Sequence, residues 1–118
     1  SLLKEKINTD PLTLHFSTSK SRNILGADEK QKVADIAKYT AHDKAAVVLI
    51  VGHSDNVGNR DSNVALGQKR AEFTKNYLSK NGIGAQIETE SKGPDEPIGD
   101  NGTREGKASN RRTVITIK

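Results

Sequence analysis

The sequence predicts a single α/β domain that folds as a two-layer sandwich, with two main helices packed on a mixed sheet of four strands. Three observations support this prediction. Residues 12–16 alternate between apolar and polar types, residues 45–51 form an unbroken apolar run, and residues 62–80 have the length and spacing of an amphipathic helix. A chain of 118 residues is the usual size of one domain.

The first strand and the first helix are expected in the N-terminal part of the chain. In the first strand Leu12, Leu14 and Phe16 face inward, and the residues between them face solvent. A polar loop follows, and a helix is expected over about 27–40. Its apolar residues recur on one helical face and are Val33, Ile36, Ala37 and Ala41.

The central strand and the long helix come next. The run 45–51 is rich in β-branched residues, as expected of a strand that is covered on both faces, and Gly52 ends it. After a polar loop at 53–61, the long helix has a predicted buried face of Leu66, Phe73 and Tyr77. Asn81 and Gly82 supply the left-handed turn that commonly ends a helix.

The C-terminal third completes the sheet. Residues 86–91 alternate and place charges on their outward side, which predicts an edge strand. The connection 92–110 is long enough to predict either a functional loop or local folding. Residues 113–117 form the closing strand, so the expected order is β-α-β-α-β-(loop or short helix)-β.

The composition narrows the classes of function. A net charge of +4 raises the question of nucleic acid, but acidic residues are interspersed and no aromatic residue lies among the C-terminal basic residues to stack on a base. The chain has no cysteine and no apolar run longer than seven residues, which excludes thiol chemistry, disulfides and a membrane-spanning segment within it. We therefore expect no nucleic-acid partner and no cofactor.

Because the sequence begins with neither Met nor an apolar leader, we expect it to be an excised domain or a processed product of a longer protein. Residues 1–11 are expected to be a helical or irregular lead-in from a preceding region. Residues 12–118 are expected to be the domain itself.

Catalysis is not expected. His53, Ser54 and Asp55 have the residue types of a catalytic triad, but adjacent residues rarely face one another in triad geometry, and the chain has no G-x-S-x-G turn. Neither His15 nor His42 has the spacing to complete a metal site with them. We therefore expect neither an enzyme nor a metal site.

Asp55 and Arg70 form the candidate binding pair. Asp55 lies in the loop that leaves the central strand, where ligand sites of α/β sheets tend to form. Arg70 lies on the inward side of the long helix and should lean back toward that loop. The two can form a salt bridge, or Arg70 can bind loop carbonyls. Alternatively both face a ligand, with an ammonium on Asp55 and a carboxylate on Arg70.

Two segments carry a family resemblance. One reads VLIVGHSDNVGNRDSNVALGQKRAEFTKNYL over 48–78, and the other reads GPDEPIGDNGTREGKASNRRTVITIK at the C-terminal end. They resemble the pattern GHTDxxG, Asn, LSxxRA, YL and GI, followed by GRxxNRRV, of the OmpA-like peptidoglycan-binding domain of OmpA, Pal and MotB proteins. The resemblance covers about residues 12–118.

The resemblance implies a function. It implies non-covalent binding of peptidoglycan through the diaminopimelate of its stem peptide, which anchors a membrane protein to the cell wall. Asp55 then binds the ammonium group and Arg70 the carboxylate. The domain is expected on the periplasmic side of the cell envelope of a Gram-negative bacterium, with contact to the outer or inner membrane only through a region outside this sequence. A homodimer, as in MotB-type relatives, is left open.

The resemblance extends to further residues, and one of its departures from the family pattern lies beside the expected site. Ser54 keeps a hydroxyl where the family often has Thr, and Asn63 either binds the ligand or caps the helix. Asn110, Arg111 and Arg112 match the NRR segment, and one of the two arginines, with Arg111 as the candidate, lines or braces the site. Thr18 and Ser19 lie in the loop after the first strand, where Ser19 replaces the usual acid and backbone N–H groups can contribute. The alternative function is therefore a structural or protein-interaction domain of the same fold without cell-wall binding.

Overall fold

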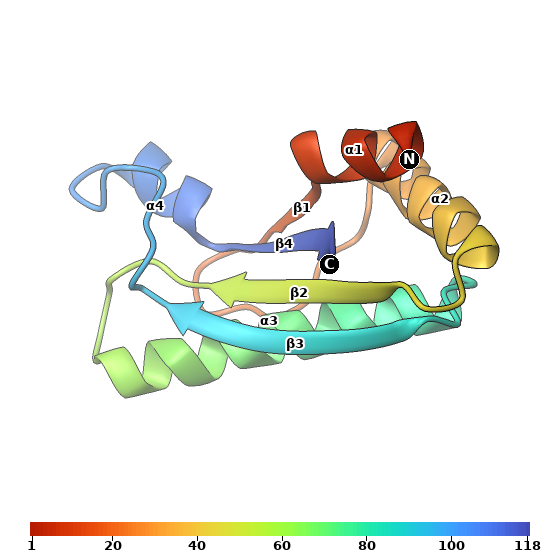
Figure 1. Ribbon diagram of the computed structural model, residues 1–118. Coiled ribbons are helices and arrows are strands. Elements are labelled where there is room, and N and C mark those ends of the chain that lie inside the picture. Colours follow the sequence, from red (N-terminus) through yellow and green to blue (C-terminus); the bar gives the residue numbers. More distant parts are fainter.

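The computed structural model describes residues 1–118 and confirms the two-layer α/β sandwich (Figure 1). In chain order the elements are α1 (Leu2–Thr9), β1 (Leu12–His15), α2 (Ala27–His42), β2 (Val47–His53), α3 (Arg60–Lys80), β3 (Gln86–Gly93), α4 (Arg104–Asn110) and β4 (Arg112–Ile117). The strands form one mixed sheet in the order β1-β4-β2-β3. β4 is antiparallel to both β1 and β2, whereas β2 and β3 are parallel.

The hydrophobic core lies between one face of the sheet and the helices α2 and α3. Alternate residues of β1, β2 and β4 are buried in register on this face, and Ile115 stands between Leu12 and Ile50. Residues from both helices, among them Ile36 and Leu78, complete the same cluster. One face of the sheet is therefore covered by helices, as the alternation in the first strand predicts.

β2 differs from its prediction in two ways. Val48 and Ile50 are fully buried, but Val47, Leu49 and Val51 are only half-buried on the open face. The prediction of a strand covered on both faces is wrong because both large helices pack on the same side. The strand also continues through Gly52 to His53, since the ladder with β3 resumes after an irregularity between these two residues.

α3 has the predicted extent to within two residues, but its buried stripe was predicted wrongly. Leu66, Phe73 and Tyr77 are half-buried, and the side facing the sheet carries mainly smaller residues: Asn63, Gly67, Arg70, Ala71, Thr74 and Leu78. A Cβ placed on Gly52 would lie 1.8 Å from the Gly67 carbonyl oxygen. The helix backbone approaches β2 so closely that only small side chains fit between them, and the large ones flank the contact.

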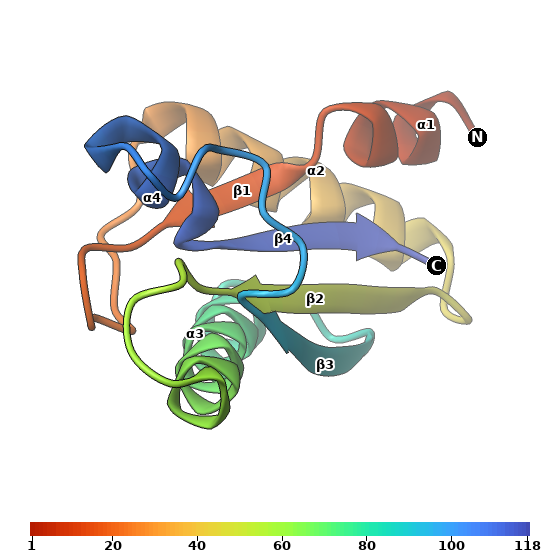
Figure 2. The same ribbon diagram turned by 90° about the vertical axis from the view of Figure 1, so that its left-hand side faces the viewer.

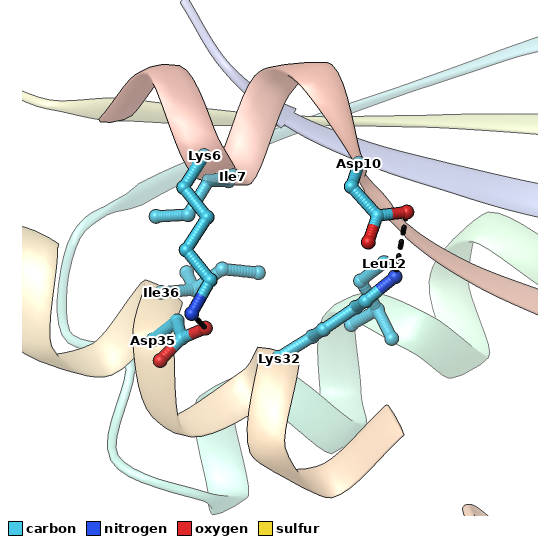
Figure 3. Close-up of a pocket in the computed structure, with 7 residues that line it drawn as sticks. All are labelled: Lys6, Ile7, Asp10, Leu12, Lys32, Asp35 and Ile36. Atoms are coloured by element: carbon cyan, nitrogen blue, oxygen red, sulfur yellow. Dashed lines mark ion pairs between the residues drawn. The ribbon is translucent and has the colours of Figure 1, made fainter. Parts of the chain in front are cut away.

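The lead-in is helical and packs on the rest of the chain. Ile7 of α1 joins the core, and the Asn8 carboxamide exchanges hydrogen bonds of 2.9 and 2.8 Å with the backbone of Ile117. Two ion pairs, Lys6–Asp35 at 3.2 Å and Lys32–Asp10 at 3.0 Å, connect the region of α1 to α2. Figure 3 shows them on either side of a cavity of about 20 Å³, which is room for about one water molecule.

α2 confirms the first predicted helix and continues to His42. Val33 and Ile36 are buried and Ala37 is half-buried, as predicted. Ala41 is exposed, and Thr40 is buried in its place. The buried hydroxyl of Thr40 is satisfied by a hydrogen bond of 2.9 Å to the carbonyl of Ile36. No helix in the chain combines the length and the apolar character needed to cross a membrane.

The connection 92–110 folds locally and ends in α4, which lies at the end of the sheet where β2 and β3 finish and β4 begins (Figures 1 and 2). The carboxamide of Asn110 holds this segment together. Its oxygen accepts the N–H groups of Ile98 and Gly99, both at 2.8 Å, and its nitrogen donates 3.0 Å to the Gly99 carbonyl. The local-folding alternative is therefore confirmed.

Candidate ligand-binding site

Asp55 lies two residues after the end of β2 and is buried, with its side chain 9% exposed. Its Oδ2 is 3.2 Å from Nη1 of Arg111, and its Oδ1 accepts the N–H of Val57 at 3.1 Å. The partner of this carboxylate is therefore Arg111, which begins the turn into β4, and not Arg70. Two of the residues named from the sequence, Asp55 and Arg111, are in direct contact.

Arg70 is fully buried and binds loop carbonyls. Its Nε donates 2.8 Å to the carbonyl of Lys20, Nη1 donates 2.9 Å to that of His53, and Nη2 donates 3.2 Å to that of Ser17. The side chain reaches back toward the loop after β2, as predicted. Of the two structural partners considered from the sequence, the structure has the carbonyls, and the salt bridge to Asp55 is absent.

The charge of Arg70 rests on an aromatic surface. Its guanidinium lies 5.4 Å from the ring centroid of Phe16, and that ring packs edge-to-face on Phe73 at 6.1 Å. Burial lowers the pKa of Arg70 to about 10, while the nearby Asp55 carboxylate raises it. Arg70 therefore remains charged at neutral pH. Three of its five N–H groups bind carbonyls, which leaves two without a partner within the chain.

The loop after β1 is held against the site by both arginines. Nε of Arg111 donates a hydrogen bond of 2.9 Å to the carbonyl of Phe16. Arg70 binds the carbonyls of Ser17 and Lys20 in the same loop. Within this turn Thr18 and Ser19 are exposed, and Ser19 has a left-handed backbone with φ of 61°. The backbone N–H groups of these two residues make no hydrogen bond within the chain.

Ser54 and Asn63 are buried and stabilise the loop after β2. The hydroxyl of Ser54 donates 2.7 Å to the carbonyl of Asp55, and the carboxamide of Asn63 donates 2.9 Å to the carbonyl of Val57. Asn63 does not cap α3, so the capping interpretation is wrong. The cap is Asn59, whose Oδ1 accepts the N–H of Ser62 at 2.8 Å.

Two residues near the site were not identified from the sequence as buried. Arg112 donates to the carbonyls of Asn110 and Glu96, and thereby ties β4 to the preceding segment. His53 is 4% exposed and its Nδ1 has no hydrogen-bond partner. The resemblance included Arg112 in the matched NRR segment as an arginine that lines or braces the site, and His53 was considered only for catalysis and metal binding.

The arrangement is suited to binding a ligand with charges of both signs. One carboxylate and two guanidinium groups lie beside a loop with unpaired backbone N–H groups. The hydroxyl of Ser54 donates to a carbonyl, and no hydrogen bond joins it to His53. The chain contains no group of three or more His, Asp and Glu residues placed to hold a metal ion.

The fold, with charged residues gathered at the ends of the strands, is that of a small domain of the α/β class. The sequence pattern of the OmpA family matches residues 17–111, and the chain belongs to this family.

Relatives with similar sequences are envelope proteins by name. The chain is 38% identical over 102 residues to the probable lipoprotein YiaD of Escherichia coli, and the aligned region covers 86% of this chain and 45% of that protein. It is 35% identical over 117 residues to the outer membrane protein Omp38 of Acinetobacter baumannii, covering 98% and 32%. It is 37% identical over 82 residues to the peptidoglycan-associated lipoprotein of Buchnera aphidicola, covering 69% and 47%. The chain thus spans less than half the length of these relatives.

Solved structures share the fold. The peptidoglycan-associated lipoprotein from Burkholderia pseudomallei superposes with a TM-score of 0.79 at 29% identity and covers 90% of this chain and 89% of that one. The C-terminal domain of Helicobacter pylori MotB gives 0.70 at 21% identity, with coverage of 90% and 83%, and at that identity the likeness is one of fold alone.

Proposed function

We propose that this domain binds peptidoglycan non-covalently, through the diaminopimelate of the stem peptide, and thereby anchors a membrane protein to the cell wall. The observation that carries the proposal is the buried Asp55 carboxylate, which pairs with Arg111 and lies near enough to Arg70 to raise its pKa, in a chain whose relatives include proteins named as peptidoglycan-associated. The module is non-catalytic and works on the periplasmic side of the cell envelope. Its attachment to a membrane is through a region outside this sequence.

The ligand is a zwitterion whose charges match the site. The ammonium of diaminopimelate binds the Asp55 carboxylate, where it competes with or joins the Arg111 contact. The adjacent carboxylate takes the two remaining N–H groups of Arg70 and the unpaired backbone N–H groups of Thr18 and Ser19. Since Arg70 has no exposed surface, this contact requires the turn over Ser17–Lys20 to shift far enough to uncover the guanidinium while Thr18 and Ser19 stay beside the ligand.

A calorimetric titration with free meso-diaminopimelate and with a stem tripeptide tests the proposal. Asp55→Asn removes the charge but keeps the shape, and we expect it to weaken binding by about thirtyfold or more, the typical cost of leaving a buried charge unpaired. Asp61→Asn, in the exposed first turn of α3, is the matched control and should bind as the wild type does. Undiminished binding by a folded Asp55→Asn protein would refute the assignment.

The second candidate is an interaction domain that does not bind the cell wall, and one observation favours it. Ser19 stands where the family usually has an acid, in the exposed turn beside the site. Sedimentation with purified sacculi distinguishes the two functions. Co-sedimentation that free diaminopimelate competes away supports wall binding, whereas a folded domain that stays in the supernatant supports the second candidate.

A further inference from the structure

A groove with two hollows lies beside the site, between the loop after β1 and the side of α3. The larger hollow has a volume of about 700 Å³, and its walls include Ser17, Lys20 and Ile24. The smaller one has a volume of about 290 Å³ and is lined in part by Tyr77 and Lys80. Arg22 and Phe73 line both hollows and therefore stand at their junction. These volumes suit a ligand of several residues.

The groove combines unpaired positive charge with apolar surface. Lys20, Arg22 and Lys80 are exposed, and no carboxylate lies within ion-pair distance of any of them. No Asp or Glu lines either hollow. Ile24 is 97% exposed, which is unusual for a large aliphatic side chain. The half-buried ring of Phe73 lines the same hollow, and that of Tyr77 lines the smaller one. An elongated ligand with carboxylates and short apolar groups is complementary to this surface.

The groove shares the loop after β1 with the site around Asp55. Ser17 and Lys20 line the larger hollow with Phe73, and the carbonyls of the same two residues bind Arg70. Phe73 also packs on Phe16, whose ring carries the guanidinium of Arg70. One turn of the loop therefore borders both the site and the groove.

We propose that this groove binds the part of the stem peptide that adjoins the diaminopimelate, with the free α-carboxylate of its glutamate residue on Arg22. The inference rests on the proposed function and adds a second point of recognition to it. The observations favour a peptide over a nucleic acid, because the cations are divided between two hollows with aliphatic and aromatic walls and do not line a continuous phosphate track.

A pair of matched ligands tests the contact. One is the stem tripeptide with its glutamate α-carboxylate free, and the other is the same peptide with that carboxylate amidated. Both are titrated into the wild type, into Arg22→Gln, and into Lys38→Gln, which removes one exposed positive charge on α2 outside both hollows. Arg22 is exposed and has no hydrogen-bond partner in the chain, so folding should not change. Thermal unfolding of each variant checks this.

We expect the wild type and Lys38→Gln to prefer the free acid by about fivefold, the upper range for a solvent-exposed charge pair, and Arg22→Gln to lose that preference. Free diaminopimelate should bind all three proteins equally. The groove inference is overturned, and the proposed function stands, if diaminopimelate binds but Arg22→Gln keeps the full preference for the free-acid peptide. The same holds if Arg22→Gln weakens only the binding of a single-stranded oligonucleotide. If neither diaminopimelate nor the peptides bind the folded wild type, the proposed function fails and the inference fails with it.

Discussion

His53 makes the stability of this domain depend on pH in a direction that the structure determines. The imidazole is 4% exposed at the end of β2, and its Nδ1 has no partner. Burial, followed by the charges of Arg112 and Lys92, lowers the pKa of His53 from 6.5 to about 4. The folded protein therefore holds this histidine neutral at a pH where the unfolded chain has already protonated it.

The magnitude follows from the two pKa values. Below pH 6.5 the unfolded chain binds a proton that the folded chain does not, so the free energy of unfolding falls as the pH falls and stops falling near pH 4. The lowering of the His53 pKa from 6.5 to about 4 corresponds to a total decrease of about 3 kcal/mol in the free energy of unfolding at low pH. About 2.5 kcal/mol of this is lost by pH 4.5. This contribution is fully present at neutral pH.

Urea unfolding of the wild type and His53→Leu between pH 7.5 and 4.5 measures this loss in the free energy of unfolding. Leu replaces the imidazole with a non-titrating side chain, so the carboxylates that titrate in this range affect both proteins equally. We expect the wild type to lose about 2.5 kcal/mol more than His53→Leu over this interval. His42→Gln, at the exposed end of α2, controls for the removal of a histidine. Parallel profiles for the wild type and His53→Leu would refute the reasoning.

Three further predictions concern stability and are checked by chemical denaturation. Gly67→Ala should cost about 1–3 kcal/mol despite the better helix propensity of Ala, because its Cβ would lie 2.3 Å from Oγ of Ser91, and Ser91→Ala in the same chain should recover part of the loss. Asn110→Ala should cost about 1–3 kcal/mol, because two backbone N–H groups lose their shared acceptor, and an unchanged midpoint would contradict this. Asn8→Ala removes both hydrogen bonds to Ile117 and should cost about 1–2 kcal/mol, whereas Ser1→Ala at the exposed N-cap of α1 should cost less.

Most of the fold could be predicted from the sequence because periodicity reports burial. The alternation in β1 and the helical spacing in α2 identify the residues that these two elements contribute to the core. The exception is at the end of α2, where Thr40 is buried and Ala41 is exposed. The prediction failed at the face of α3 because a spacing rule gives the large apolar residues to the core. Here a contact between the backbones of Gly52 and Gly67 selects small side chains, and no pattern within one helix reveals a close approach to another element.

Only part of the candidate site could be predicted from the sequence, again because contacts between distant segments leave no local pattern. The lean of a helical side chain was enough to direct Arg70 toward the loop after β2, and the structure has it there. Its actual acceptors include carbonyls of the loop after β1, about fifty residues earlier in the chain. Sequence spacing carries no information on which distant loop supplies a carbonyl, and the same limit applies to the pairing of Asp55 with Arg111.

Because Arg70 binds both loops, a loss of binding in an Arg70 variant has two meanings: a lost ligand contact or a displaced loop. Arg70→Lys separates them when meso-diaminopimelate is compared with an analogue in which the carboxylate at one centre is replaced by hydrogen. If Arg70 holds that carboxylate, the wild type prefers diaminopimelate and Arg70→Lys binds both equally. If Arg70 only positions the loop, the variant binds both more weakly by the same factor. Backbone hydrogen exchange at Lys20, whose N–H group binds the Ser17 carbonyl, then changes in the ligand-free protein as well. The first result supports the role proposed for Arg70, and the second would transfer the carboxylate contact to the backbone of the turn.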